Sequence, residues 1–300
     1  MVNDIVISAD GTCDLPESLV EKYNIKILPF YINYKGTRFK DGDEVTSSAL
    51  VEYLERQDEV VSSSAPDIEE YRKYFKEISE NGQKQVIHIT IAKKLSIAYK
   101  NAVDGSKGME YIHIVDSGSA SHGMGLFTLA AADFASRMAN AESIIKELEK
   151  VKGKISCSFI LRSTFHLANN RRLNQFVSNM LIFFKIKPII RIDNDDLRVK
   201  GLYIGNRESY ARKFVRSALR SKKNISEDIL FISVAGCSDD IQQIVYDEAT
   251  KIIHWKKIFV ADTSATCLCN IGAHSIGIMF CKKIGLKRKI LHFLLRQFPS

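Results

Sequence analysis

The residues best suited to chemistry are hydroxyl side chains gathered in four short loops. Three of the loops follow a stretch typical of a buried strand, and the fourth, 62–65, leads into an expected helix. The loops span residues 10–14, 62–65, 92–96 and 116–121, and their hydroxyls belong to Thr12, Ser62, Ser63, Ser64, Ser96, Ser117, Ser119 and Ser121. Hydroxyls and the free N–H groups of a helix start can both donate hydrogen bonds to a carboxylate or a phosphate. Taken singly, each Ser or Thr is more often a helix cap, but several such loops converging favour an anion-binding site.

Motifs of several familiar enzyme classes do not occur in the sequence. It contains no G-x-G-x-x-G or Walker-type loop and no G-x-S-x-G elbow, and no Ser is placed with His and Asp as in a catalytic triad. Cys267-x-Cys269 with His274 offers too few ligands for a typical zinc site. We therefore expect no catalytic residue, no metal and no cofactor.

An alternation of strand-like and helix-like segments must position these loops. In the first half we expect strands at 4–9, 25–34, 86–91 and 111–115, with helices at 14–23, 47–56, 66–80 and 95–103. Asp14 and Glu17 have the spacing of a capping box, and Pro66 suits the first turn of a helix. This order indicates a mainly parallel sheet flanked by helices. Ligands of such sheets bind outside the carboxyl ends of the strands, where the hydroxyl-rich loops lie.

The second half is less regular and predicts a mixed or antiparallel sheet with helices. Strands are expected at 155–161, 187–192, 197–204, 229–235, 257–261 and 275–280, with helices at 207–221 and 240–253. The turn Asn194-Asp195-Asp196 indicates a hairpin. We predict an α/β fold with an N-terminal domain at 1–152, a C-terminal domain at 153–281 and a basic amphipathic tail at 282–300.

Composition indicates a folded protein with an uneven charge distribution. Of the 300 residues, 45% are hydrophobic and 26% are charged, and no apolar run approaches the roughly 18 to 20 residues of a membrane span. Six cysteines without a visible secretory signal favour a cytoplasmic protein with reduced thiols. Residues 1–150 carry a net charge of −7 and residues 151–300 one of +15. The basic residues are dispersed, which disfavours nucleic acid. The tail either docks on its own domain or makes transient contact with an anionic membrane surface.

Six motifs in order resemble the DegV family of bacterial fatty-acid-binding proteins. The resemblance spans about residues 4–280. The matching segments are Asp10-Gly11-Thr12-Cys13-Asp14-Leu15-Pro16, Ser63-Ser64-Ala65-Pro66, Leu95-Ser96-Ile97-Ala98-Tyr99, Asp116-Ser117 with Gly123-Met124-Gly125-Leu126, Asn170-Arg171-Arg172-Leu173, and Ile186-Lys187-Pro188-Ile189.

The resemblance implies a two-domain carrier with a long-chain fatty acid in an apolar tunnel. Such a carrier presents the acid to a separate acyl kinase for phospholipid synthesis. The implied carboxylate-binding residues are Ser63, Ser64, Ser96 and Asn270, with Thr12, Ser119 and His274 as further candidates. Arg172 matches an arginine associated with docking to the kinase.

Three departures from the family pattern bear on the ligand. Asn270 stands where the family has His, and an amide can donate a hydrogen bond but cannot carry a proton. Lys93 and Lys94 add positive charge before Ser96, and Arg171 replaces a glycine. The alternatives are therefore a binding protein for another acidic lipid or small acidic ligand, or an enzyme acting on a small phosphorylated substrate.

Overall fold

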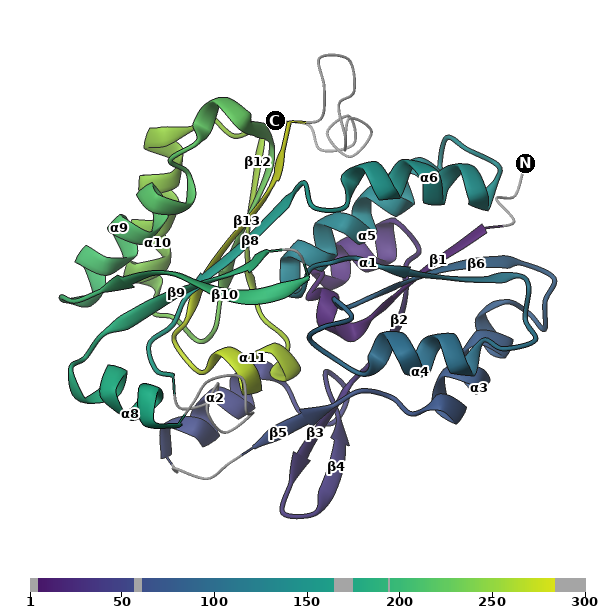
Figure 1. Cartoon of the computed structure of the whole chain (residues 1–300), viewed down its shortest axis with the longest axis horizontal. Coiled ribbons are helices and arrows are strands. Elements are labelled where there is room, and N and C mark those ends of the chain that lie inside the picture. Colours follow the sequence, from purple (N-terminus) through teal and green to yellow (C-terminus); the bar gives the residue numbers. More distant parts are fainter. Residues whose placement is uncertain (1–4, 57–60, 165–174, 194, 284–300) are drawn as a thin grey trace.

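Two β-sheets of different design organise the chain (Figure 1). The computed structural model describes residues 5–56, 61–164, 175–193 and 195–283. Within these residues the first sheet has the strand order β2-β1-β6-β7, and every pair in it is parallel. Its strands are β1 (Ile5–Asp10), β2 (Lys26–Leu28), β6 (Gln85–Thr90) and β7 (Ile112–Asp116). The predicted parallel sheet is confirmed.

Within the described residues, the second sheet contains both parallel and antiparallel pairs. Its order is β10-β9-β8-β13-β11-β12, with a parallel pairing between β11 and β12 and antiparallel pairings elsewhere. The strands are β8 (Ile155–Ile160), β9 (Lys187–Asp193), β10 (Asp196–Tyr203), β11 (Ile225–Val234), β12 (Lys257–Asp262) and β13 (Ile276–Lys282). The expected hairpin between β9 and β10 is present. A parallel and a mixed sheet in one chain confirm the predicted α/β fold class.

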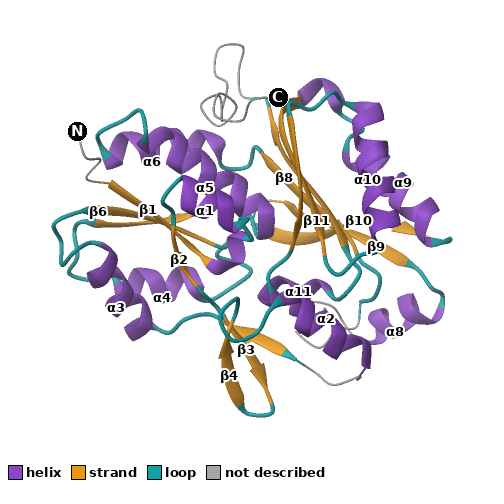
Figure 2. Cartoon of the chain, turned by 180° about the vertical axis from the view of Figure 1, so that it is seen from behind, coloured by secondary structure: helices purple, strands orange, loops and turns teal. Residues whose placement is uncertain are grey.

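Helices flank both sheets. The helix pair α3–α4 lies on one face of the first sheet and α1, α5 and α6 lie on the other, while α9 and α10 cover the outer face of the second sheet (Figures 1 and 2). The helices are α1 (Glu17–Lys22), α2 (Ser47–Arg56), α3 (Ile68–Ile78), α4 (Ala98–Gly105), α5 (Ser121–Ala135), α6 (Ala141–Val151), α8 (Gln175–Phe183), α9 (Arg207–Ala218), α10 (Asp239–Ile252) and α11 (Ala265–Ile271), with short 3₁₀ turns η1 (Gly11–Cys13) and η2 (Lys222–Asn224). None of them within the described ranges is long and apolar enough to cross a bilayer.

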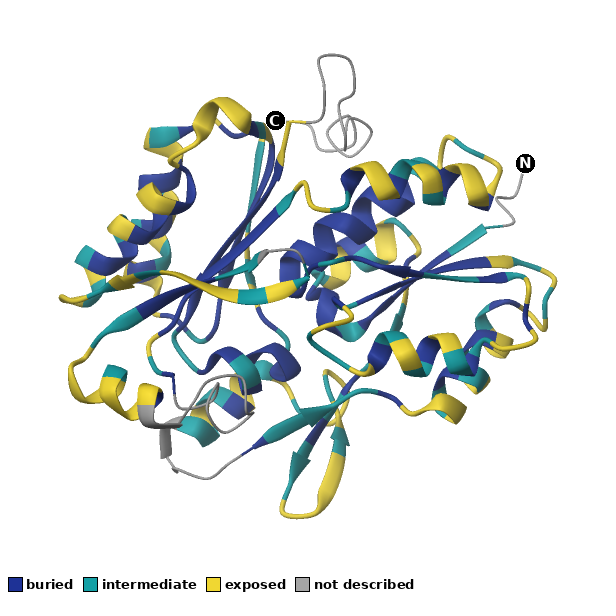
Figure 3. Ribbon diagram, viewed as in Figure 1, coloured by how far each residue is buried: buried dark blue, intermediate teal, exposed yellow. Residues whose placement is uncertain are grey.

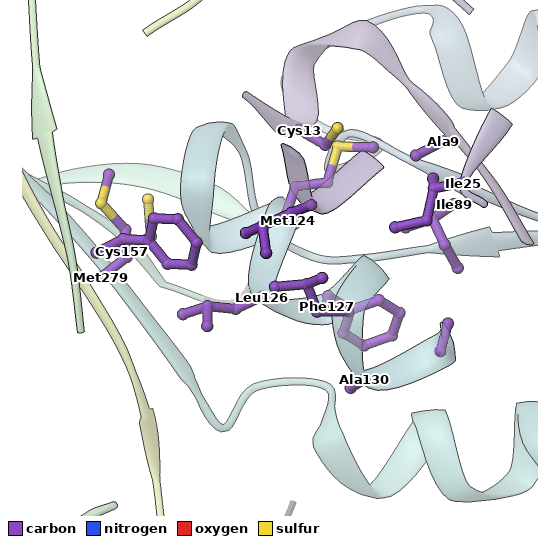
Figure 4. Close-up of a cluster of buried hydrophobic side chains, with 14 of the residues drawn as sticks. Ala9, Cys13, Ile25, Ile89, Met124, Leu126, Phe127, Ala130, Cys157 and Met279 are labelled. Atoms are coloured by element: carbon purple, nitrogen blue, oxygen red, sulfur yellow. The ribbon is translucent and has the colours of Figure 1, made fainter. Parts of the chain in front are cut away.

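Helix α5 lies between the two sheets and is buried along nearly its whole length (Figures 3 and 4). Two of its glycines permit this close packing. A Cβ on Gly123 would lie 2.9 Å from Cys157 Cβ of β8, and one on Gly125 would lie 2.6 Å from the carbonyl oxygen of Cys13. The apolar cluster around α5 draws side chains from both sheets. The division into domains at residue 152 stays a prediction, since this core is shared.

A small third sheet reaches from the first half of the chain to the second. It consists of β3 (Tyr31–Tyr34), β4 (Thr37–Lys40) and β5 (Ser62–Ser64) in the order β4-β3-β5, and with α2 it packs against α11. The expected single strand at 25–34 is wrong, because the chain leaves the first sheet at Pro29, which has no N–H to donate to a ladder. The expected loop at 62–65 is also wrong in part, since β5 pairs with β3.

Two predicted helix starts differ from the structure. Asp14 does not cap α1, which begins after Pro16; it has a left-handed backbone with φ 50° at the end of η1. Pro66 precedes α3 rather than entering it, and the cap is Asp67, which forms a capping box with Glu70. Asp14 instead accepts a hydrogen bond from the Ser121 hydroxyl at 2.6 Å, a use of its carboxylate that competes with capping.

Candidate ligand-binding site

Ser63 and Asn270 meet where the small third sheet packs against α11. Asn270 Nδ2 donates a hydrogen bond to Ser63 Oγ at 3.2 Å and another to the carbonyl oxygen of Thr266 at 2.9 Å. Both side chains are half-buried, so they remain accessible to a ligand. Because Ser63 Oγ accepts from the amide, its own O–H is available to donate elsewhere. The pair joins β5 and α11, elements that lie far apart in the sequence.

The elements next to this pair contribute apolar side chains to the large buried cluster of the chain. They come from β3, α2, the residue before β5, and α11, and they are Ile32, Leu50, Val61, Leu268 and Ile271. Ile32 is the direct cross-strand partner of Ser63. The site thus combines the polar Ser63–Asn270 pair with these five apolar side chains, which we call the apolar wall.

Ser96 lies in the loop before α4. Its Oγ accepts a hydrogen bond from the N–H of Ala98 at 3.2 Å, and the side chain is half-buried. Asn101 ties α4 to the segment that carries Ser63, because its Nδ2 donates to the carbonyl oxygen of Pro66 at 2.8 Å. The structure therefore connects the two serine loops through α4.

Asp10, which the sequence predicts as part of the first polar loop and of the first family motif, connects the same two segments. Its Oδ2 accepts from the N–H of Ile91 at 3.0 Å, at the start of the loop that leads to Ser96. Its Oδ1 accepts from the hydroxyl of Tyr71 at 2.5 Å, and Tyr71 belongs to α3, which follows Ser63. His88 Nε2 lies 3.2 Å from the same oxygen. The position of Asp10 directly at the carboxyl end of a strand is the sequence feature that could have identified it as a residue of the site.

The other predicted residues are placed differently. Ser64 Oγ donates to Asn33 Oδ1 at 3.3 Å within the third sheet. Thr12 is buried, and its hydroxyl donates to Met124 Sδ at 3.6 Å. Ser119 is buried, and burial raises the pKa of the nearby Cys157 thiol to about 12. His274 has a left-handed backbone with φ 62°, and its N–H donates to the carbonyl oxygen of Ala235 at 2.5 Å.

The N-terminal end of α11 is held by two acidic side chains. Asp41 accepts hydrogen bonds from the N–H groups of Ala265 and Thr266, at 3.1 and 2.7 Å. Asp14 accepts from Ser121 Oγ and, at 3.4 Å, from Cys267 Sγ. Burial raises the pKa of Asp14 from 3.8 to about 6, although its hydrogen bonds lower it. Burial likewise keeps the pKa of the Cys267 thiol well above its usual value, so the thiol stays a donor.

A cavity of about 580 Å³ opens beside this end of α11. Its walls come from the loop after β1, the segment 41–47 and the end of β12, and they include Asp14, Asp41 and Ser264. Neither this cavity nor a second one of about 520 Å³ on the second sheet is lined by Ser63, Ser96 or Asn270.

No group of three His, Cys, Asp or Glu suited to a metal occurs among the described residues. Cys267 and Cys269 are buried in α11. Arg171 and Arg172 lie outside the residues that the structure describes, as do residues 284–300 of the basic tail.

A parallel sheet and a mixed sheet joined by a buried helix, with a small third sheet packed against α11, define an α/β protein with a candidate ligand site where Ser63 meets Asn270. The model of a family described as "Uncharacterised protein, DegV family" matches residues 4–283. The chain belongs to the DegV family.

Individual relatives agree with this assignment. A DegV domain-containing protein of Clostridium perfringens is 28% identical over 213 residues, which cover 69% of this chain and 75% of the relative. The structure of a DegV family protein from Thermus thermophilus, described for its fatty acid binding, has a TM-score of 0.82 at 20% identity and covers 93% of this chain and 99% of its own. A DegV family protein from Eubacterium eligens, loaded with heptadecanoic acid, has a TM-score of 0.78 at 17% identity, with coverages of 93% and 100%. These structures share the fold of this chain.

Proposed function

We propose that this chain binds a long-chain fatty acid and holds its carboxylate with Ser63, Ser96 and Asn270. The observation that carries the proposal is the hydrogen bond from Asn270 Nδ2 to Ser63 Oγ, which joins two motif positions 207 residues apart. The heptadecanoic acid bound by the Eubacterium eligens relative supports the ligand class. In this proposal the protein carries its ligand and catalyses no reaction.

The chemistry of the three side chains suits a carboxylate. Asn270 fixes Ser63 Oγ as an acceptor, so the hydroxyl proton of Ser63 can point to a ligand oxygen. Ser96 accepts from the N–H of Ala98 and likewise retains its own proton for donation. Two such donors offset part of the cost of removing a carboxylate from water. The exposed Lys93 and Lys94 add positive charge close to Ser96 in the sequence.

An acyl chain supplies the larger part of the binding free energy. Burying about 15 methylenes at roughly 0.8 kcal/mol each gives about 12 kcal/mol before the cost of ordering the chain. We place the chain along the apolar wall formed by Ile32, Leu50, Val61, Leu268 and Ile271. The carboxylate hydrogen bonds then fix which end of the ligand faces the site, and the apolar wall provides retention.

The proposal includes a partner. The bound acid would be presented to a separate acyl kinase, with Arg172 in the contact, as the family resemblance implies. An Arg172→Ala variant should then retain its fatty acid and lose acyl phosphate formation in the presence of the kinase. Loss of both properties would instead place Arg172 in ligand retention.

The test of the binding site is mass spectrometry of the ligand that the purified protein retains. Wild type should hold one fatty acid per chain, and Ser63→Ala and Ser96→Ala should each retain added acid about tenfold less tightly, as expected for one lost hydrogen bond to a charged group. Ser62→Ala is the matched control, because alternation along β5 places Ser62 on the opposite face from Ser63.

Three outcomes discriminate among the alternatives. Retention unchanged in both alanine variants would refute the assignment of the carboxylate-binding residues. A different acidic lipid in the spectrum would keep those residues and change the ligand. A protein that neither carries nor takes up any fatty acid would favour the alternative of an enzyme or binding protein for a small acidic molecule.

A further inference from the structure

A second cavity, of about 520 Å³, lies on the second sheet where α9 ends and β13 finishes. It is of the size of small-molecule sites. The described residues that line it include four cations and no Asp or Glu. The cations are Arg191, Lys200, Arg220 and Lys282, and the polar neutral residues are Ser156, Ser217, Ser221 and Asn224.

The sequence of the strands explains why this place is hollow. On the face beneath α9, Ile160 of β8 and Ile189 of β9 pack into the apolar cluster of the helix layer. Further along the same face β8 carries Ser156 and Ser158, and β9 carries Arg191, which is the register partner of Ser158. Small side chains replace large ones just where α9 stops, and this leaves room for the cavity beside the sheet. The floor remains apolar, since Phe280 is buried there.

One of the cationic side chains, Arg191, is fixed by a hydrogen bond. Arg191 Nε donates to Ser158 Oγ at 3.0 Å, which fixes the guanidinium at the cavity. Arg198 of β10 is the direct cross-strand partner of Arg191. Like charges directly opposite each other destabilise a sheet, so an anion bound beside Arg191 would reduce this repulsion.

Two acidic groups on neighbouring elements are already paired with other cations. Glu248 of α10 binds Arg216 at 2.6 Å and Arg212 at 3.5 Å, and Asp228 of β11 binds Lys256 at 2.5 Å. Neutralisation of the carboxyl-terminal end of α9 would account for Arg220 alone. It does not account for Arg191 of β9 and Lys282 of β13, which come from two strands.

We propose that this cavity binds the phosphate group of a phosphorylated ligand, independently of the fatty-acid site. A phosphate accepts hydrogen bonds from guanidinium, ammonium and hydroxyl donors at once, and the lining supplies all three. The phosphate belongs either to a soluble molecule or to a lipid headgroup, and these sources differ in whether binding needs a membrane.

The test compares full-length variants at constant ionic strength with two probes. One probe is glycerol 3-phosphate in isothermal titration, and the other is vesicles of equal parts phosphatidylglycerol and phosphatidylcholine in co-sedimentation. The variant R191Q/K282Q removes two cavity cations. The control K73Q/K76Q removes two exposed lysines from α3. R220Q, in the turn after α9, is a second test variant that leaves the Arg191–Ser158 bond intact.

A phosphate site predicts that wild type and K73Q/K76Q bind alike, and that R191Q/K282Q and R220Q bind at least about tenfold more weakly. If the cavity variants bind glycerol 3-phosphate more weakly than wild type, the ligand is a soluble molecule. If only their binding to vesicles is weakened, the ligand is a lipid headgroup. Equal behaviour of the cavity variants and the control with both probes overturns the proposal. Retained fatty acid, measured on the same samples, should be unchanged in all of them.

Discussion

Asp14→Asn removes a buried carboxyl group whose pKa is raised by burial from 3.8 to about 6. Between these two values the folded protein holds a proton that the unfolded chain has released. The free energy of unfolding of wild type therefore falls as the pH rises through this window. The rise of the pKa from 3.8 to about 6 lowers the free energy of unfolding of wild type by about 3 kcal/mol, and this loss is complete above about pH 6.

The variant lacks this ionisation, so its stability relative to wild type should grow by about 3 kcal/mol between about pH 4 and about pH 7. Asn suits the left-handed backbone of this position, where φ is 50°. Changed hydrogen bonds to Ser121 and Cys267 add an offset that is the same at every pH. The pH dependence of the difference, rather than its value at one pH, is thus the quantity to measure.

Urea unfolding followed by far-UV circular dichroism across this pH range gives the difference directly. Other carboxyl groups are common to both proteins and cancel to first order. Ser121→Ala provides a second check, because losing the hydroxyl that donates to Asp14 should move the wild-type window to higher pH. A difference between wild type and Asp14→Asn that stays flat across the range would refute the raised pKa.

Three further changes test the packing and the site. Asp10→Asn should destabilise the fold by about 2 to 4 kcal/mol in urea unfolding, since this buried carboxylate accepts from a tyrosine hydroxyl and a backbone N–H. Gly123→Ala should cost about 1 to 3 kcal/mol by overpacking, because its Cβ would lie 2.4 Å from Ser119 Oγ. Gly201→Ala, whose Cβ would meet its first neighbour at 3.7 Å, is the matched control and should be nearly neutral. Asn270→His should make fatty-acid release slower below about pH 6.5, where the imidazole is charged, and a pH-independent release rate would argue against Asn270 as a carboxylate contact.

The parallel sheet could be predicted from the sequence because its strands, loops and helices alternate in local order. Each of β1, β6 and β7 is a short apolar run followed by a polar loop, and such a repeat has few alternative arrangements. Helix α11 could not be predicted in the same way. Six of its seven residues are buried, so it lacks the polar face that marks a helix in a sequence.

Local sequence patterns do not predict the contact between Ser63 and Asn270, for a related reason. Motif positions indicated both residues, but their contact depends on the chain leaving the first sheet at Pro29 and forming β3, β4 and β5 against α11. Nothing in the alternation of residues 25–34 distinguishes one long strand from two short ones in different sheets. Tertiary packing decides this, because β3 and β5 pack against α11.

Two similar capping patterns show how a side chain is used when it could either cap the neighbouring helix or contact a distant element. Asp14 and Asp67 are each followed three residues later by a Glu, and only Asp67 forms a capping box. At the first pattern Pro16 precedes the helix, and the carboxylate of Asp14 is engaged by the hydroxyl of Ser121 and the thiol of Cys267. A side chain that serves a contact between distant elements is not available to the helix beside it. Asp14 therefore joins η1, α5 and α11, the helix that carries Asn270, and its protonation should stabilise the arrangement on which the proposed carboxylate site depends.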